Sequence, residues 1–516
     1  MVSVVHSAAL NGIDAFPVTV EAARAGRSRN SAGSAELPII GLPDTAVREA
    51  AGRVRSAMNS CGFSLYAGIT TVNLAPADRR KEGSAFDLPI FLSLISDNIE
   101  GFDAEGKMFI GELSLTGAVR PVRGVLSMAS AARDAGFKEI YVPAENANEA
   151  SAAGEVTVYA VDNVVQLYEH LAGIRPIEPT VFDASQFEDS VFDYDLDFAD
   201  VKGQESARFA LEVAAAGAHN LLMIGPPGSG KSMLAARLPS ILPPQTPEEA
   251  VETTKIHSVA GILPAGASLL TLKPFRAPHH SLSPAGLAGG GKVPVPGEIS
   301  LAHNGVLFLD ELPEFDKRAT EILRQPLEER RVSITRVNGK VTFPASFMLV
   351  CAMNPCRCGY YGAPNRTCTC SPSDRHAYIT KLSGPLLDRI DIQIEVPALD
   401  YSQLSSTTFA EPSSEIRKRV IAARKFARER CQSGGDRPVA NSEMDQSYLR
   451  KYCRLDEDCA ALMRSAYERL GLSARGYDRI LRLARTIADL DSSESVRRDD
   501  IMLAIRLRSL DRKYFR

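Results

Sequence analysis

Hydrophobic positions follow two different periods along this chain. In about the first 175 residues, valine-rich segments alternate with polar residues at a period of two, which is typical of strands, while other segments have helical spacing. The predicted strands are Val2–Val5, Val18–Glu21 and Thr70–Leu74, and the predicted helices are 44–59 and 124–135. Residues 1–175 are therefore predicted to form a mixed α and β domain.

Between about residues 201 and 400, short apolar runs end in glycine-rich or polar segments. Three of these runs, Leu221–Ile224, Val306–Leu309 and Phe347–Met353, predict buried strands. In α/β folds, the polar residues that follow such strands meet at the carboxyl edge of the sheet. We therefore predict an α/β core with its site residues at one edge.

The remaining segments have a different composition. Residues 401–516 show helical spacing at 413–432, 442–451 and 456–470, and Ser473 is a candidate cap for a further helix, so this part is predicted to be a helical lid. In residues 176–200, acidic and aromatic residues alternate. We interpret this stretch as a linker whose acidic residues form a solvated face, with a decoy for DNA as the less favoured alternative.

Composition limits the class of protein. A chain of 516 residues is longer than one hydrophobic core usually supports, so we predict about three domains. The net charge of −4 excludes a protein that is basic throughout, so any contact with nucleic acid must come from local patches. The sequence has neither an apolar run of membrane-spanning length nor the pattern of a signal peptide, so we expect a cytoplasmic protein without a membrane partner.

Residues 225–232 fit the phosphate-binding motif G-x-x-x-x-G-K-[ST] at every specified position. Its glycines let backbone N–H groups approach a polyphosphate, and the helix that follows directs its positive end at the same anion. We expect Lys231 to reach the β- and γ-phosphates of ATP and Ser232 to bind Mg²⁺. The predicted nucleotide-binding residues are Gly225, Pro226, Pro227, Gly228, Ser229, Gly230, Lys231 and Ser232.

Two acidic residues, Asp310 and Glu311, directly follow the apolar run Val306–Leu309. A phosphate-binding loop needs one carboxylate for the magnesium shell and another group to activate water. We therefore expect Asp310 to organise Mg²⁺ and Glu311 to act as the general base.

Four of the nine cysteines lie close together, at Cys356, Cys358, Cys368 and Cys370. Two close pairs separated by a loop suit tetrahedral Zn²⁺ held by four thiolates. A structural zinc site is the favoured interpretation, with free thiols as the alternative. Four cysteines leave no open position for a catalytic zinc.

The nucleotide motifs resemble those of AAA+ ATPases. In that superfamily, the polar residue that ends the next strand, here Asn354, is sensor 1 and helps to position the attacking water. Residues 384–394 resemble the arginine-finger region of the helix-2-insert branch, which includes magnesium chelatases and MCM helicases. The resemblance implies that Arg389 reaches a γ-phosphate held by a neighbouring subunit, which makes a hexameric ring the expected form. Residues 473–476 resemble sensor 2, with Arg475 as the first choice and Arg479 as the second for contact with the γ-phosphate.

Three N-terminal segments, 80–87, 111–124 and 140–146, resemble the proteolytic domain of Lon proteases, whose fold is α+β. The chemistry of those proteases needs a serine that is activated by a lysine. An ungapped comparison places Ala85 rather than Ser84 at the nucleophile's position, and no lysine follows Gly124 where the base should lie. We expect a Lon-like fold without peptidase activity that serves assembly or partner binding.

The stretch between the two nucleotide motifs identifies the family. Residues 275–292 and 294–305 contain a His279-His280 pair and a run of glycines. Together with the motifs above, they make essentially the whole chain similar to the ComM/YifB family of magnesium-chelatase-like bacterial ATPases. This resemblance implies an ATP-driven hexameric DNA motor that promotes branch migration in recombination, notably in natural transformation, with recombination proteins as candidate partners.

Residues 330–343 alternate around Asn338-Gly339, a strong hairpin signal. In this branch of AAA+ proteins, such a hairpin projects into the central channel. We expect Arg336 and Lys340 to contact DNA phosphates there, and Lys292 in the glycine-rich loop is a further candidate. The alternative is a solvated hairpin with ordinary basic edge residues. Nothing near His279 and His280 completes a metal site, so we expect loop or helix-cap roles for them.

Three other functions compete with a DNA motor. The ATPase subunit of a porphyrin magnesium chelatase would share the core but would need neither the Lon-like domain nor the cysteines. An ATP-dependent protease would need the missing lysine. A non-enzymatic adaptor would not need both nucleotide motifs. Stimulation of ATP hydrolysis by branched DNA, rather than by chelatase partners, would separate the first rival from the motor.

Overall fold

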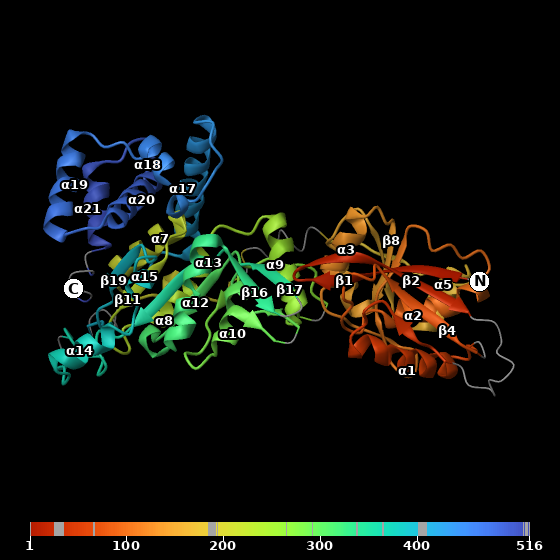
Figure 1. The fold of residues 1–516 in the computed structure, drawn as a ribbon. Helices are drawn as coiled ribbons and strands as arrows, with labels where there is room; N and C mark the ends of the chain where they lie inside the picture. Colours follow the sequence, from red (N-terminus) through yellow and green to blue (C-terminus); the bar gives the residue numbers. More distant parts are fainter. Residues whose placement is uncertain are drawn as a thin grey trace.

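The computed structural model has three parts (Figure 1). A sheet-rich N-terminal part lies at one end, an α/β core follows, and a helical bundle lies beside the core. The structure describes residues 2–24, 36–65, 68–183, 192, 194–264, 266–291, 293–336, 339–363, 366–400, 410–508, 510 and 514.

An eight-stranded mixed sheet forms the N-terminal part, in the order β10-β9-β8-β5-β1-β2-β4-β3. Its strands are β1 Val2–Asn11, β2 Asp14–Arg24, β3 Ile39–Ile40, β4 Thr70–Ala75, β5 Lys107–Phe109, β8 Glu139–Pro143, β9 Thr157–Val161 and β10 Pro179–Thr180. A small ribbon adds β6 Glu112–Leu113 and β7 Val119–Arg120. The helices are α1 Thr45–Ser60, α2 Asp87–Ile95, α3 Val125–Asp134, α4 Ala147–Ser151 and α5 Val164–Leu171, with 3-10 turns η1 Ser96–Asn98 and η2 Ala144–Asn146.

The predicted strands and helices of this part are present, with different ends. β1 and β2 pair in antiparallel register from Val2 opposite Ala23 to Asn11 opposite Asp14, so both are longer than their valine-rich centres. Helix α1 begins where Asp44 caps it, through a 2.8 Å hydrogen bond that Val47 N donates to Asp44 Oδ1. β10 pairs with β9 within the segment that the composition marked as linker, so the sheet extends past residue 175.

The core is built on a five-stranded parallel sheet in the order β12-β15-β18-β11-β19. The strands are β11 Leu221–Ile224, β12 Phe275–Arg276, β15 Val306–Leu309, β18 Met348–Met353 and β19 Ile392–Glu395. Leu221 and Met223 pack in one apolar cluster, and Leu222 and Ile224 pack in another. The central strand is therefore buried on both faces, which explains its unbroken apolar sequence.

The other elements of the core surround this sheet. They are α7 Glu205–Gly217, α8 Lys231–Arg237, α9 Pro247–Ala260, α10 Pro284–Ala288, α11 Glu298–Leu301, α12 Lys317–Ile322, α13 Arg324–Glu329, α14 Pro372–Ile379 and α15 Gly384–Leu387. The 3-10 turns are η3 Phe198–Asp200, η4 Leu238–Ile241 and η5 Leu312–Glu314. Two short ribbons pair β13 Gly289–Gly290 with β14 Val295–Pro296 and β16 Arg331–Arg336 with β17 Gly339–Pro344.

The C-terminal part is helical, as predicted. Its elements are α17 Ser413–Ser433, η6 Asn441–Glu443, α18 Gln446–Tyr452, α19 Glu457–Leu470, α20 Ala474–Leu490 and α21 Arg498–Arg506. The helix predicted at 442–451 begins only at Gln446, because Asp445 Oδ1 caps it by accepting hydrogen bonds from Ser447 N and Tyr448 N. Within the described ranges, no helix combines the length and apolar character that crossing a bilayer requires.

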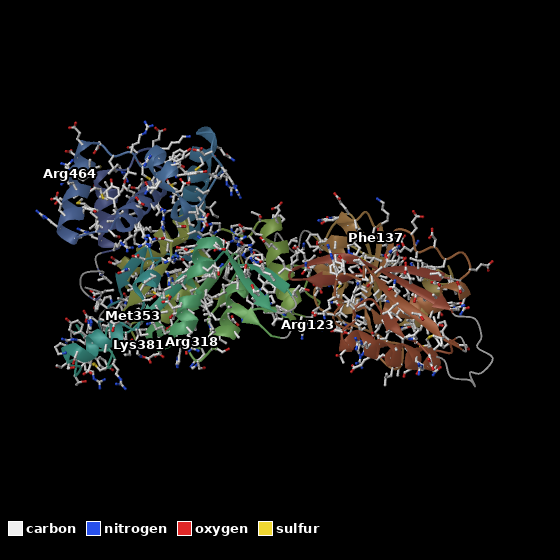
Figure 2. All side chains as sticks on the ribbon, in the orientation of Figure 1. Arg123, Phe137, Arg318, Met353, Lys381 and Arg464 are labelled. Carbon is white, nitrogen blue, oxygen red and sulfur yellow. The ribbon has the colours of Figure 1, made fainter. Side chains whose placement is uncertain are left out.

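A polar network joins the N-terminal part to the core where α3 lies against α9. Gly124 N donates a 3.0 Å hydrogen bond to Ser258 Oγ, and this hydroxyl donates a 2.6 Å bond to Glu149 Oε2. Burial raises the pKa of the Glu149 carboxyl. Arg123, which Figure 2 shows at this junction, lies beside Gly261, where an added Cβ would come within 2.7 Å of Arg123 Nε. The two parts thus meet through specific contacts.

Candidate nucleotide-hydrolysis site

The order of the core sheet brings the predicted nucleotide motifs to one edge. β15, β18 and β11 are neighbours and parallel, so their carboxyl ends lie side by side. The phosphate-binding loop follows β11, Asp310 and Glu311 follow β15, and Asn354 follows β18. Three segments that are far apart in sequence therefore form one site, as expected for a parallel α/β sheet.

The phosphate-binding loop needs its glycines for conformation and for close packing. Gly228 and Gly230 have φ angles of 76° and 91°, in the left-handed region that favours glycine. A Cβ on Gly225 would lie 2.2 Å from Val396 O, so only glycine fits there. No atom lies within 4 Å of the position a Cβ would take on Gly228. This arrangement fits a loop that presents its backbone to a phosphate chain.

Lys231, the first residue of α8, is the buried cation of this site. Its Nζ donates hydrogen bonds to Gly225 O at 2.8 Å and Pro226 O at 2.9 Å, and it lies 3.4 Å from Asn354 Oδ1. Burial lowers the pKa of the ammonium group, while the nearby carboxylates of Asp310 and Glu311 act in the opposite direction. The contact with Asn354 places the predicted sensor 1 residue beside the loop.

Ser232 and Asp310 bring two oxygen atoms together beside Lys231. Ser232 Oγ donates a 2.5 Å hydrogen bond to Asp310 Oδ2, and Glu311 N donates a 2.9 Å bond to Asp310 Oδ1. Hydroxyl and carboxylate oxygens are the ligands that Mg²⁺ prefers. This donor set therefore fits the predicted magnesium site.

Glu311 has a backbone conformation that is uncommon for a non-glycine residue, with a φ of 51°. Its side chain is 53% exposed, and Oε2 lies 3.5 Å from His280 Nδ1. The His280 ring is tilted by 35° relative to the His279 ring, with ring centroids 4.0 Å apart, and it meets Phe315 edge to face at 6.4 Å. Residues on both sides thus hold the His280 ring beside the candidate base.

His280 is a site residue that the sequence analysis missed. We expected only loop or cap roles for the histidine pair. His279 has such a local role, since its Nδ1 lies 2.8 Å from Ser281 Oγ, but His280 contacts Glu311. The available signal was position: the pair follows β12, the strand next to β15.

Replacing His280 with alanine is expected to lower the kcat of ATP hydrolysis about 10-fold to 100-fold, the usual effect of losing a side chain that supports a group at a metal site. The substitution removes the imidazole whose Nδ1 lies 3.5 Å from Glu311 Oε2. ATP affinity should change little, because His280 does not contact the phosphate-binding loop in the described contacts. Steady-state kinetics and nucleotide titration separate these two quantities. His376→Ala, at an exposed histidine of α14, is the control, and equal kcat values for the two variants would contradict a role for His280.

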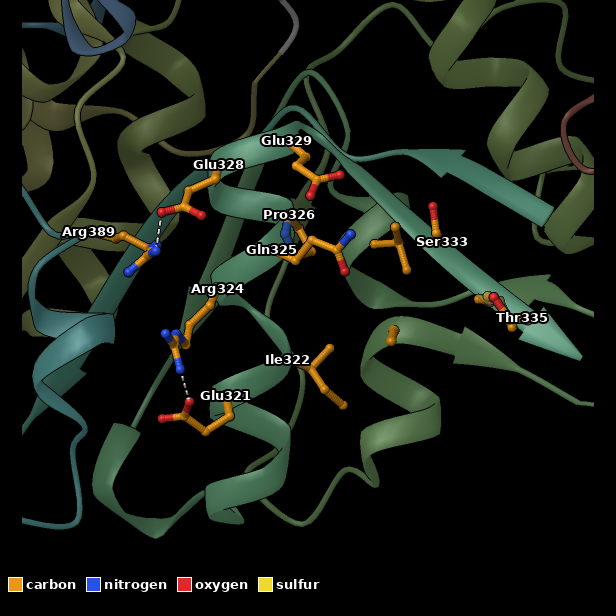
Figure 3. A pocket seen from close by; sticks show the side chains of 13 residues that line it. Glu321, Ile322, Arg324, Gln325, Pro326, Glu328, Glu329, Ser333, Thr335 and Arg389 are labelled. Carbon is orange, nitrogen blue, oxygen red and sulfur yellow. Dashed lines mark hydrogen bonds and ion pairs between the residues drawn. The ribbon is translucent and has the colours of Figure 1, made fainter. Parts of the chain in front are cut away.

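Arg389 lies just after α15 and faces a cavity of about 560 Å³ (Figure 3). It forms an ion pair with Glu328, and its Nη1 donates a 2.5 Å hydrogen bond to Pro385 O. The cavity is lined by residues of α10, α12, α13 and β16, and its lining includes none of the residues 225–232, Asp310 or Glu311. Arg389 thus opens onto a different surface from the phosphate-binding loop of its own chain.

The two sensor 2 candidates both approach the turn that carries Arg389. Arg475 Nη1 lies 3.6 Å from Asp388 Oδ2 and is 69% exposed. Arg479 is 9% exposed and lies between Asp388 and Asp391, at 3.7 Å and 3.5 Å. Burial lowers the pKa of the Arg479 guanidinium. Arg475 is therefore the more exposed of the two candidates, and Arg479 is held between the two carboxylates of the turn.

The four cysteines form a compact cluster. All their sulfur atoms lie within 4.8 Å of one another, and the spacings among Cys356, Cys358 and Cys368 are 3.3, 3.6 and 3.6 Å. A tetrahedron with Zn–S bonds of about 2.3 Å has sulfur spacings of about 3.8 Å. All four thiols are free, and the backbone N–H of Tyr360 lowers the pKa of the Cys358 thiol to about 5. The cluster fits a structural zinc ion.

The cysteine loop packs against the phosphate-binding loop. Gly359, between the two cysteine pairs, has a φ of 86°, and a Cβ there would lie 2.7 Å from Pro227 Cδ. The cysteine loop and the phosphate-binding loop are therefore in close contact at Gly359 and Pro227.

The predicted hairpin is present, but its turn differs from the prediction. Arg336 pairs with Gly339, so the strands are separated by residues 337 and 338 and Gly339 belongs to β17. The expected Asn338-Gly339 turn is wrong by one residue, because Gly339 continues the pairing of the strands. Lys340 is exposed. The side chain of Arg336, and Lys292 as a whole, lie outside the described residues.

In the N-terminal part, the residue at the Lon nucleophile's position is buried. Ala85 is 5% exposed and packs in an apolar cluster with Val125, Leu126 and Met128 of α3. Ser84 lies one residue before it, at the start of the turn that leads into α2.

Known families and proteins match nearly the whole chain. Residues 197–404 match the family described as "Magnesium chelatase, subunit ChlI", residues 27–146 match "Subunit ChlI of Mg-chelatase", and residues 410–508 match the C-terminal part of ChlI. Competence protein ComM of Haemophilus influenzae is 40% identical over 518 residues, which covers 99% of this chain and 98% of that protein.

Two further relatives define the limits of this similarity. YifB of Salmonella typhimurium, named as uncharacterized, is 40% identical over 516 residues, 99% of this chain and 97% of its own length. A 67 kDa magnesium-chelatase subunit of Chlorobaculum parvum is 30% identical over 162 residues. These residues cover 31% of this chain and 23% of that subunit's length. This chain therefore belongs to the ComM/YifB family of magnesium-chelatase-like AAA+ proteins.

Proposed function

We propose that this protein is an ATP-hydrolysing, ring-forming DNA motor that promotes branch migration during recombination and natural transformation in the cytoplasm. Lys231 and the glycines of the loop would hold the phosphates, and Ser232 with Asp310 would hold Mg²⁺. The ion would supply positive charge to the phosphates when bound. Glu311, beside His280, would take the proton from the attacking water, which Asn354 helps to position.

The position of Arg389 supports the proposed ring. Because its side chain faces a cavity remote from its own phosphate-binding loop, it would complete the site of a neighbouring subunit as an arginine finger. Each subunit would then lend one cation to the next, and a closed hexamer would leave no site incomplete. Arg475 would contact the γ-phosphate as sensor 2.

DNA as the partner is supported by the β16–β17 hairpin. β16 also lines the cavity that Arg389 faces, so the finger and the hairpin share a wall. Exposed Lys340 lies near the hairpin's end, and a ring would repeat it around one channel. A relative named as a competence protein agrees with a role in DNA transactions.

The proposal is tested by incubating the purified protein with a synthetic four-way junction, Mg²⁺ and ATP. We expect the arms to exchange, with no exchange in the presence of a non-hydrolysable ATP analogue, and we expect junction DNA to stimulate ATP hydrolysis. Absence of both effects, in a preparation that hydrolyses ATP, would rule the proposal out.

A role as the ATPase subunit of a porphyrin magnesium chelatase has less support. The similarity to the 67 kDa magnesium-chelatase subunit of Chlorobaculum parvum spans 31% of the chain, whereas the similarity to ComM spans 99%. We also propose that the N-terminal part has a Lon-like fold without peptidase activity, because Ala85 occupies the nucleophile's position and α3 supplies no lysine.

We further propose that Cys356, Cys358, Cys368 and Cys370 hold one structural zinc ion. Replacing Cys358 with serine is expected to reduce bound zinc from about one ion per chain to a small fraction, because a hydroxyl replaces a thiolate ligand. Metal analysis of the purified protein measures this content. The control Cys61→Ser, which lies far from the cysteine loop, should retain the metal. Purified wild-type protein that contains no bound zinc would contradict the proposal.

A further inference from the structure

The turn between β1 and β2 of the N-terminal part contacts the hairpin of the core. Gly12, with a φ of 70°, lies so close that an added Cβ would be 3.1 Å from Val341 Cγ1 and 3.6 Å from Thr342 O of β17. The next residue, Ile13, is 9% exposed and belongs to an apolar cluster that otherwise contains, among the described residues, only residues from position 222 onward. Figure 1 shows this end of β1 beside β17.

The hairpin needs support from outside its two strands. β16 and β17 form a separate two-stranded sheet, and an isolated two-stranded hairpin is at best marginally stable in water. Its apolar residues Val332, Ile334 and Phe343 pack into the same cluster as Ile13. Ile334 pairs with Val341, and the adjacent pair contains Lys340. The turn therefore contacts the hairpin one residue pair away from the proposed DNA-binding lysine.

The turn is itself held in place. Ser127 Oγ, buried on α3, donates a 2.5 Å hydrogen bond to Ile13 O. The first turn of α3 is anchored to α9 of the core by the bond from Gly124 N to Ser258 Oγ. The turn is thus also fixed to the core through α3, so it can limit the movement of the hairpin.

We infer that the N-terminal part positions the hairpin through Gly12 and Ile13, and so sets how strongly DNA stimulates ATP hydrolysis. This inference rests on the proposed function, because it gives the N-terminal part a task in the motor. Gly12 and Ile13 are positioning residues, which act on DNA through β17.

Replacing Ile13 with alanine in the full-length protein tests the inference. We expect the ratio of DNA-stimulated to basal ATP hydrolysis to fall about threefold to thirtyfold, the range of coupling changes caused by residues between two sites. The basal rate should stay close to that of the wild type, because the described contacts of Ile13 include none of residues 225–232, Asp310 or Glu311. Ile13→Leu, which keeps the apolar volume, should restore the ratio.

Asn148→Ala is the matched control. It removes a different hydrogen bond across the same junction, the 2.9 Å bond from Asn148 Nδ2 to Gly266 O, and should leave the ratio unchanged. If Ile13→Ala and Asn148→Ala lower the ratio equally, the turn only helps to hold the two parts together, and the inference is overturned. If wild-type protein shows no stimulation by DNA, the proposed function fails first.

Val341→Ala approaches the contact from the hairpin side, and it covers the case in which Ile13→Ala does not fold. Its ratio should fall in the same direction. Where all variants fold, the double variant should lose less than the sum of the two single losses, because both side chains pack in one apolar cluster. Additive losses, or an unchanged ratio in Val341→Ala, would overturn the inference.

Discussion

Replacing Arg389 with alanine is expected to reduce ATP turnover about 10³-fold, the lower end of the effect of an arginine finger. ATP binding should remain, because Arg389 faces a cavity whose lining contains no residue of the phosphate-binding loop. Turnover is measured with a coupled ATPase assay and binding with a fluorescent nucleotide.

Arg324→Ala provides the control for this variant. Arg324 lines the same cavity and forms an ion pair with Glu321 at 2.8 Å, as Arg389 does with Glu328 (Figure 3). Its loss should leave most of the turnover in place. If Arg389→Ala hydrolyses ATP at the wild-type rate, the finger assignment is wrong.

Replacing Glu311 with glutamine is expected to reduce turnover about 10²-fold to 10⁴-fold, because an amide cannot accept the proton of the attacking water. ATP and Mg²⁺ should still bind, since Ser232 and Asp310 remain in contact. Rapid-quench measurement of a single turnover reports the chemical step directly.

Glu314→Gln is the comparison for Glu311→Gln. Glu314 lies in the neighbouring 3-10 turn and forms an exposed ion pair with Lys381 at 3.3 Å. We expect it to retain turnover, because exposed ion pairs contribute little. If the single-turnover rate of Glu311→Gln equals that of the wild type, Glu311 is not the base and another group accepts the proton.

The parts of the site that the sequence predicted are those encoded in short segments. The phosphate-binding loop and the strand ending at Asp310 each combine a buried strand with a fixed spacing of polar residues, so both could be located from local pattern alone. That these strand ends meet follows from the rules of parallel sheets. The positions of Lys231 and Asn354, 3.4 Å apart, agree with that reasoning.

Other features depend on contacts between segments that are distant in sequence, and no local pattern predicts such contacts. His280 meets Glu311 only because β12 pairs with β15. Arg479 is fixed by Asp388 and Asp391, which makes it a partner of the Arg389 turn. The sequence likewise gave no sign that the turn at Ile13 would pack on a hairpin more than 300 residues away.

Errors at the ends of elements have local causes that periodicity does not detect. α18 begins four residues after the start of its apolar pattern because Asp445 caps it. The strands of the hairpin pair as far as Arg336 opposite Gly339, so Gly339 belongs to β17 and not to the turn. In both cases the type of element was predicted correctly and its boundary was not.

If each active site is completed by a neighbouring subunit, two inactive variants should restore activity when mixed, and this experiment tests the proposal most directly. Arg389→Ala keeps an intact nucleotide site, and Glu311→Gln keeps an intact finger. In rings assembled from equal amounts of both, about a quarter of the sites should combine a working base with a neighbour's arginine, so activity should return to about a quarter of the wild-type rate. A mixture that stays as inactive as its two components would contradict the account.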